Sequence, residues 1–429
     1  MLPSPTPNSL LVIGYVWPEP RSSAASGHMM QLLDCFLQHG WQITFSSPAN
    51  DGEHKADLSA LGIREQAIEL NNESFDTFVR ELNPAVVLFD RFMMEEQFGW
   101  RVEQQCPKAL RVLETVDLHT LRDARQQLLK NHLAAGFGDD CAALFNPSAS
   151  ALYQLMAASD TAQREIASIY RCDLSLMVSD AEIRLLNEQF KLSTDLLLHC
   201  PLLLDSTPRA TRPFAERANF ISIGNFRHAP NWDAVLWLKQ SIWPLIREQL
   251  PQAQLHIYGA YTPPKATALH NAAQGFHIMN WAPAALEVME AARVCLAPLR
   301  FGAGIKGKIV DAMLCGTPNV TTAIGAEGMH GEELWPGAIV DNAQAFADAA
   351  VQLYRDENQW QQAQDNGWTL LAARYQMAHF APLLMARIEH CLGNLEQHRL
   401  ANFTGSMLRH HHHKSTKYMA QWIEAKNRP

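Results

Sequence analysis

The sequence lacks the patterns that would place it in several common classes of protein. Its eight cysteines are scattered, without a C-x-x-C pair or a cysteine–histidine cluster at zinc spacing. We therefore expect free thiols in a reducing compartment. No apolar run approaches the ~20 residues that a membrane-spanning helix needs. A D-x-D motif is also missing, so we expect no metal site.

Positive charge is scarce as well. The chain has 35 lysines and arginines against 44 acidic residues, a net charge of −9, which argues against binding nucleic acid through a basic surface. Without a G-x-G-x-x-G fingerprint, a nicotinamide cofactor is not expected. The start MLPSPTPNS has no basic segment before the apolar run Leu10–Val16, so we expect no secretory signal. These absences favour a cytoplasmic protein and leave peripheral contact with the inner face of a membrane open.

What is present indicates a doubly wound α/β architecture. At 429 residues the chain should form two or three domains. An apolar strand over 10–16, a helix over 28–39 and a strand over 41–45 follow each other, which is typical of a parallel sheet covered by helices. A second set of this kind starts at Ala218–Ile223.

The segment Leu202–Arg217 holds two prolines and several charges, and we place a domain boundary there. We expect a first domain over residues 1–206, a second over residues 207–375, and a return helix with a polar extension over residues 376–429. The extension contains His410–His413, and we expect it to be solvated, flexible or partly helical.

The most informative stretch is Pro298–Met329, PLRFGAGIKGKIVDAMLCGTPNVTTAIGAEGM. A buried strand over Val294–Ala297 leads into a turn of small residues, and a helix is expected over Ile305–Leu314. Gly316 and Pro318 end that helix, and a short strand follows at Asn319–Thr322. Small residues at two strand-to-loop junctions suit a site where backbone approaches a ligand closely.

The residue types in this stretch favour a diphosphate ligand. A helix N-terminus carries unpaired N–H groups and the positive end of the helix dipole. Gly302 and Gly304 remove the Cβ atoms that would keep a phosphate away, while Lys306 and Lys308 add cations where the dipole alone would prefer carboxylates. Asp311 offers a carboxylate for ribose hydroxyls. Alternatively, Lys308 and Asp311 form a surface ion pair, and the glycines serve only packing.

The same stretch resembles the donor-binding signature of retaining glycosyltransferases of the GT-B fold, in the group described as family 4-like or glycosyl transferases group 1. The shared pattern is P-x-x-x-G-x-G-x-K-x-K-hydrophobic-x-[E/D]-A-M-x-x-G-x-P-V-V-x-T-x-x-G-x-E-G. The resemblance implies two Rossmann-like domains facing a cleft, with C-terminal helices that cross back. It also implies a nucleotide-diphosphate sugar as donor substrate rather than a cofactor, and a glycan, a lipid-linked molecule or a cell-surface polysaccharide as acceptor.

The resemblance further implies which residues touch the donor. Ala303 stands where the family usually has a glutamate that contacts the donor sugar, and Asp311 replaces the glutamate that contacts the ribose. His119, with Asp117 beside it, matches a histidine that contacts the sugar, and Arg227 matches basic residues near the diphosphate. The remaining donor-binding positions are Gly14, Gly224, Asn225, Asn231, Ile305 and Glu327.

Several of these positions also have simpler explanations. Gly14 suits a plain turn, His119 a helix entry and Arg227 a solvated loop. After the strand Ala85–Phe89, Asp90 either lines the cleft with Arg91, Glu95 and Glu96 or caps the following helix. Ser179 and Glu182 have the spacing of a capping box, which is sufficient to explain both.

The sequence thus predicts a glycosyltransferase in which His119, Asp117, Arg227 and Lys306 act in catalysis. Retention of configuration is implied by the resemblance only. Two alternatives stay open: a protein of the same fold that binds a nucleotide sugar without catalysis, and a hydrolase or epimerase that acts on the nucleotide sugar alone.

Overall fold

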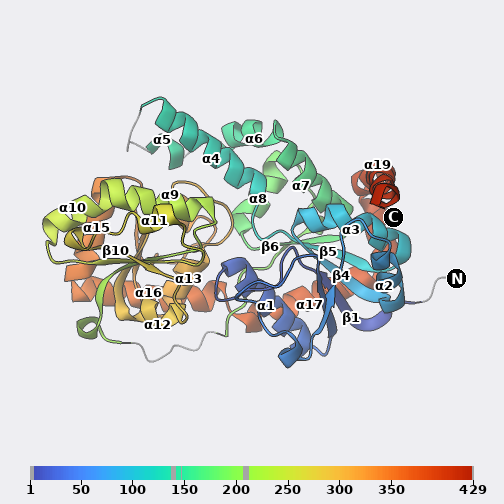
Figure 1. Cartoon of the computed structure of the whole chain (residues 1–429), viewed down its shortest axis with the longest axis horizontal. Coiled ribbons are helices and arrows are strands. Elements are labelled where there is room, and N and C mark those ends of the chain that lie inside the picture. The colour runs from blue at the N-terminus through green and yellow to red at the C-terminus, as the bar shows by residue number, and fades with distance from the viewer. Residues whose placement is uncertain (1–3, 137–141, 146, 206–211, 428–429) are drawn as a thin grey trace.

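The computed structural model contains two α/β domains and a group of C-terminal helices (Figure 1). It describes residues 4–136, 142–145, 147–205 and 212–427. Each domain is built on one parallel sheet. The first sheet has the strand order β3-β2-β1-β4-β5-β6-β7, and the second has the order β10-β9-β8-β11-β12-β13. The expected GT-B arrangement of two Rossmann-like domains is confirmed.

The first domain alternates strands and helices as the sequence predicts. Its strands are β1 (Thr6–Ile13), β2 (Gln42–Ser47), β3 (Arg64–Ala67), β4 (Pro84–Asp90), β5 (Leu110–Glu114), β6 (Leu174–Met177) and β7 (Leu197–His199). Its helices are α1 (Ala24–Gln38), α2 (Ser74–Leu82), α3 (Phe92–Gln105), α4 (His119–Ala134), α5 (Ala142–Phe145), α6 (Ala149–Ala157), α7 (Asp160–Arg171) and α8 (Asp180–Gln189). Every residue of β4 and β5 is buried, because helices cover both faces of a parallel sheet.

The second domain repeats this plan. Its strands are β8 (Ala218–Ile223), β9 (Leu255–Tyr258), β10 (Phe276–Asn280), β11 (Ala292–Ala297), β12 (Asn319–Thr321) and β13 (Gly337–Ile339). Its helices are α9 (Ala229–Trp237), α10 (Trp243–Gln249), α11 (Pro264–Thr267), α12 (Ala285–Ala291), α13 (Gly307–Leu314), α14 (Ala323–Ala326), α15 (Ala343–Arg355) and α16 (Glu357–Arg374).

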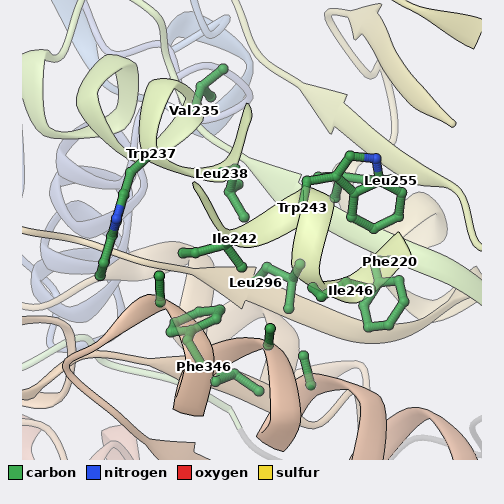
Figure 2. Close-up of a cluster of buried hydrophobic side chains, with 14 of the residues drawn as sticks. Phe220, Val235, Trp237, Leu238, Ile242, Trp243, Ile246, Leu255, Leu296 and Phe346 are labelled. Carbon is green, nitrogen blue, oxygen red and sulfur yellow. The ribbon is translucent and has the colours of Figure 1, made fainter. Parts of the chain in front are cut away.

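The core of the second domain holds large aromatic side chains. Figure 2 shows Trp237, Trp243, Phe220 and Phe346 among aliphatic residues from β9, β11 and the neighbouring helices. Phe145, from α5 of the first-domain sequence, stacks on Trp237 with ring centroids 6.4 Å apart. The segment α4–α5 therefore reaches over the second domain (Figure 1), and it contributes to that domain's core.

The chain returns to the first domain after α16. Residues of α17 (Met377–Gly393), among them Leu384 and Ile388, belong to the core cluster under the first sheet. Then α18 (Leu395–Ala401) and α19 (Phe403–Asn427) follow. Figure 1 shows α19 beside α3, at the end of the first domain that is far from the second domain. The polar extension is thus largely helical.

Three local expectations were wrong. The helix expected from His28 begins at Ala24, because the Ser23 hydroxyl caps it by accepting the N–H of Ser26. The helix expected from Ile305 begins at Gly307, because the preceding glycine turn has left-handed backbone at Gly304. Asp90 does not cap α3: it is the last residue of β4, and its carboxylate accepts the N–H of Tyr15.

Candidate functional site

The glycine turn of the signature lies against the first domain. A Cβ atom at Gly304 would come within 2.8 Å of the Asp117 Cβ, and Gly304 has a φ of +64°. The Gly304 N–H donates a hydrogen bond to Oε1 of Glu182 at 2.7 Å. Glycine is therefore required at position 304 both for the backbone conformation and for the close approach of the two domains.

Two helix N-termini meet at this junction. Gly307 opens α13 and Ala24 opens α1, and a Cβ at Gly307 would lie only 2.4 Å from the Ala24 Cβ. The first turns of α13 and α1 are therefore in contact across the junction. Helix N-termini favour anions, because their first N–H groups have no partner within the helix.

The two predicted lysines flank the start of α13. The ammonium of Lys306 donates to the carbonyl of Gly304 at 2.6 Å, and that of Lys308 donates to Oδ1 of Asn231 at 2.7 Å. Burial lowers the pKa of each lysine to about 8; for Lys306, the nearby carboxylate of Glu327 opposes this shift. Within the described ranges, neither ammonium has a carboxylate within 4.0 Å.

Asp311 is the second charged residue of α13, after Lys308. Burial raises the pKa of its carboxyl to about 7. The alternative of a Lys308–Asp311 ion pair is wrong, since Lys308 bonds Asn231 instead. Among the residues that the structure describes, no side chain donates to the Asp311 carboxylate.

The first loop of the second domain joins this group. Asn231 accepts from Lys308 and donates through Nδ2 to the carbonyl of Asn225 at 2.9 Å. A Cβ at Gly224 would clash with the Asn231 amide at 2.6 Å, so glycine lets this side chain fold back. Asn225 also donates to the carbonyl of Ser22 in the first domain, at 3.3 Å. Asn225, Asn231 and Lys308 thus form one hydrogen-bonded unit, for which Gly224 leaves room.

Arg227 packs against an aromatic ring. Its guanidinium carbon is 3.6 Å from the ring centroid of Tyr261, and its side chain is exposed. The Tyr261 hydroxyl in turn donates to Glu19 of the first domain at 2.9 Å. A role for Arg227 at the diphosphate stays a prediction.

On the first-domain side, the residues after β5 gather acidic and basic groups. Asp117 accepts a hydrogen bond from Arg122. Burial would raise the pKa of Asp117, but Arg122, with His119 and His228, holds that pKa below its usual value. His119 is the first residue of α4. Its ring Nδ1 lies 3.3 Å from the Glu165 carboxylate, and its backbone N–H donates a hydrogen bond to that carboxylate. A helix-entry role therefore explains the backbone contact of His119. A contact between its imidazole and a sugar stays a prediction.

Arg125 and Glu182 also connect the domains. The sequence-based interpretation left out Arg125 and assigned Glu182 to a capping box. Arg125 of α4 donates to both carboxylate oxygens of Glu327 and to the carbonyl of Gly302. Arg125 follows Leu121 by four residues, so both side chains lie on the same, buried face of the helix. An arginine on an apolar helix face is the sequence signal that could have identified Arg125. Glu182 does not complete a capping box: it accepts from Gly304 and, at 3.4 Å, from Leu118, and burial with the charge of Asp117 raises its pKa to about 8.

The remaining predicted positions have packing roles. A Cβ at Gly14 would lie 2.5 Å from the Phe45 ring, which explains glycine there without a phosphate. Ala303 packs against a core cluster of the first domain, and Ile305 packs against a cluster that includes Ile309 and Leu371 of the second. Asp90 and Arg91 line a small pocket beside the start of α1. Donor contacts at positions 14, 303 and 305 stay predictions.

The described part of the chain contains no group of three or more metal-binding side chains that could hold an ion. The cationic side chains at the junction are those of Lys306, Lys308, Arg122 and Arg125.

Comparison with known proteins agrees with this architecture. Sucrose-phosphate synthase from Thermosynechococcus elongatus has a TM-score of 0.62 at 14% identity, over 90% of this chain and 99% of that chain. HepE from Anabaena, solved in complex with UDP-glucose, has a TM-score of 0.61 at 13% identity, over 89% of this chain and 99% of that chain. WaaG, a glycosyltransferase involved in lipopolysaccharide biosynthesis, has a TM-score of 0.54 at 12% identity, over 87% and 98%.

These identities show the shared fold alone. No curated protein matches the sequence significantly. The family model described as Glycosyl transferases group 1 matches residues 217–356, the segment that carries the first loop of the second domain, the glycine turn, both lysines and Asp311. Residues 217–356 thus match the model of Glycosyl transferases group 1, in a chain that has the GT-B fold.

Proposed function

We propose that this glycosyltransferase moves a sugar from a nucleotide-diphosphate sugar to an acceptor hydroxyl. The observation that carries the proposal is the pair Lys306 and Lys308 at the start of α13, whose ammonium groups face no carboxylate within 4.0 Å in the described ranges. Burial disfavours their charge, which lowers both pKa values. A diphosphate placed there would supply the missing counter-charge.

The nucleotide would lie along α13. Its ribose hydroxyls would donate to Asp311, whose carboxylate has no donor of its own in the described structure. The HepE structures contain UDP or UDP-glucose, so UDP-sugars are the first donors to test. Polysaccharide or lipid-linked acceptors are the first acceptors to test, because WaaG takes part in lipopolysaccharide biosynthesis.

Catalysis would rest on the charge that develops on the leaving group. The acceptor oxygen bonds to the anomeric carbon as the bond from that carbon to the diphosphate oxygen breaks. Lys306, Lys308 and the N–H groups at the start of α13 stabilise the departing diphosphate. In a retaining reaction the acceptor approaches the same face, and its hydroxyl proton passes to the departing diphosphate. Asp117 and His119 would orient the sugar, with Arg227 as a further cation.

One assay separates this function from its two alternatives. Release of the nucleoside diphosphate is followed from a panel of nucleotide sugars, with and without candidate acceptors. A transferase releases it in proportion to acceptor, a hydrolase releases it without acceptor, and a binding protein shows a thermal shift with donor and no release. Because two ammonium groups already lie at the site, we expect turnover to continue in EDTA.

The Lys306→Ala variant tests the donor site directly. We expect donor affinity to fall by about 10–100-fold, the value of a charge-assisted hydrogen bond of ~1.5–3 kcal/mol. Lys265→Ala is the matched control, since Lys265 is an exposed lysine of the same domain that lies over the Trp232 ring. Unchanged donor affinity in Lys306→Ala would refute the proposed site.

A further inference from the structure

The C-terminal helix α19 presents large apolar side chains to solvent. Phe403, Met407, Tyr418, Met419 and Trp422 are between 46% and 75% exposed. On the opposite side of the helix, Ala420 and Arg409 are almost fully buried against the first domain. Surface helices usually turn their apolar side chains inward, but here the large apolar side chains face solvent.

The exposed residues form one stripe. Phe403, Met407, Tyr418 and Trp422 are spaced by 4, 11 and 4 residues, which places them within about 100° of arc at 3.6 residues per turn. At ~1.5 Å per residue the stripe is about 28 Å long. Its four large side chains differ from scattered surface apolar residues, which need no explanation.

The charge on this helix is positive. Over Phe403–Asn427 the sequence contains Arg409, Lys414, Lys417 and Lys426 but a single carboxylate, Glu424. Glu424 is turned inward, where Oε1 accepts from Nη2 of the buried Arg101 at 2.5 Å. Beside the exposed aromatic residues lie the half-buried Lys417 and the exposed Lys426, whose ammonium is 5.2 Å from the centroid of the Trp422 ring. Glu424 is the single carboxylate of the helix, although the whole chain has a net charge of −9.

Two arginines fix the C-terminal helices to the first domain. Arg399 of α18 donates to both oxygens of Asp173 and to the carbonyls of Pro107 and Ala109. Arg409 of α19 lies 3.5 Å from the carboxylate of Glu103. The stripe is thus held at a set position on the domain.

We infer that the outer face of α19 binds the surface of an anionic lipid bilayer. Trp, Tyr and Phe side chains are favoured at the boundary of headgroups and acyl chains, and lysines beside them are attracted to anionic lipid headgroups. No helix in the described chain is long and apolar enough to span a membrane. This inference goes beyond the proposed function and does not depend on it.

The absence of carboxylates on the outer face of α19 favours a lipid surface over a protein partner. A protein interface of this size would normally contain both signs of charge around an apolar centre. Here a linear stripe with one sign of charge matches the planar, uniformly negative surface of a membrane.

The full-length chain is mixed with vesicles of phosphatidylcholine alone or with phosphatidylglycerol added, and bound protein is separated by flotation. We expect binding to the anionic vesicles, reduced by high salt. The double variant Phe403→Ser/Trp422→Ser should bind at least tenfold more weakly. Leu334→Ser is the control, because Leu334 is equally exposed, at 70%, on the second domain.

Three results would overturn the inference: no binding of the unmodified chain to anionic vesicles, equal binding of the double variant, or equal loss in Leu334→Ser. A double variant that instead changes the oligomeric state on size-exclusion chromatography, without vesicle binding by either protein, would assign the stripe to a second copy and likewise refute it. Thermal unfolding confirms that each variant is folded. Donor affinity gives a separate readout of the proposed function, whose failure leaves vesicle binding unaffected.

Discussion

Arg125 of the first domain and Glu327 of the second form a bidentate ion pair across the domain junction. Nη2 lies 2.6 Å from Oε1 and Nη1 lies 2.8 Å from Oε2. Arg125 is buried, and it also holds the carbonyl of Gly302. The pair therefore ties the glycine turn and the loop after it to α4, and it is one of the contacts that join the two domains.

Removing the arginine should loosen this junction. Because Glu327 is 31% exposed, we expect Arg125→Ala to cost roughly 1–3 kcal/mol, less than the loss of one partner from a fully buried pair. Thermal unfolding of Arg125→Ala, Glu327→Gln and the double variant measures the coupling between them. In the control Arg184→Ala, an exposed arginine near Asp180 is lost, and the change should stay within about 0.5 kcal/mol. Additive effects of the two single variants would contradict the coupling.

Lys308 should lower the folding stability of the protein, although it contributes to donor binding. Burial moves its pKa from 10.5 to about 8, so the folded state disfavours the protonated form. This penalty is fully present below pH 8 and disappears as the pH rises from 8 through 10.5, where the unfolded chain also loses the proton. We expect Lys308→Met to raise the melting temperature at pH 7, with a gain that shrinks toward pH 10.

The same substitution should weaken donor binding by about 10–100-fold. Lys265→Met is the control for both measurements, because Lys265 is exposed. A lower melting temperature in Lys308→Met at pH 7 would show that Lys308 stabilises the fold, contrary to this expectation.

Asp311 should recognise the ribose. Its pKa is raised to about 7 by burial, and hydroxyl donors prefer the carboxylate form, so affinity for UDP should increase as the pH rises through 7. Asp311→Asn should remove this dependence and weaken UDP binding by about tenfold, for a loss of ~1–2 kcal/mol. Calorimetry with UDP and with 2′,3′-dideoxy-UDP measures both effects. If Asp311→Asn weakens both ligands equally, the carboxylate does not contact the ribose.

Gly304 should tolerate no side chain. In Gly304→Ala the added Cβ would meet Asp117 at 2.8 Å, and a φ of +64° costs a non-glycine residue about 1–2 kcal/mol. We expect the two domains to be forced apart, with donor turnover reduced at least tenfold and helix content unchanged by circular dichroism. Gly393→Ala provides the comparison, since no atom lies within 4 Å of a Cβ there. Normal turnover in Gly304→Ala would show that the close contact is dispensable.

The sequence was most informative where one local pattern determines one element. The apolar runs Ala85–Phe89 and Val294–Ala297, which lie in β4 and β11, are buried throughout, and such runs predict parallel strands without knowledge of their neighbours. The small residues and lysines from Gly302 to Lys308 likewise predict the turn and the helix start within two residues. These features depend on backbone sterics and burial of adjacent residues, which a short segment contains.

The sequence was misleading where a side chain has two available partners. Glu182 has the spacing of a capping box, yet it bonds the Gly304 N–H, 122 residues away. The Gly304 N–H belongs to a distant segment, whose position a local pattern does not specify.

The amino-acid sequence by itself determined two parallel-sheet domains and a cationic, glycine-rich helix start, because these follow from hydrophobic periodicity and backbone conformation. Only the tertiary structure decided that Arg125, Glu182 and Asp117 face that helix start, and that the outer face of α19 is aromatic. Those relationships arise when segments more than a hundred residues apart pack together, and their free energy depends on burial and charge in three dimensions.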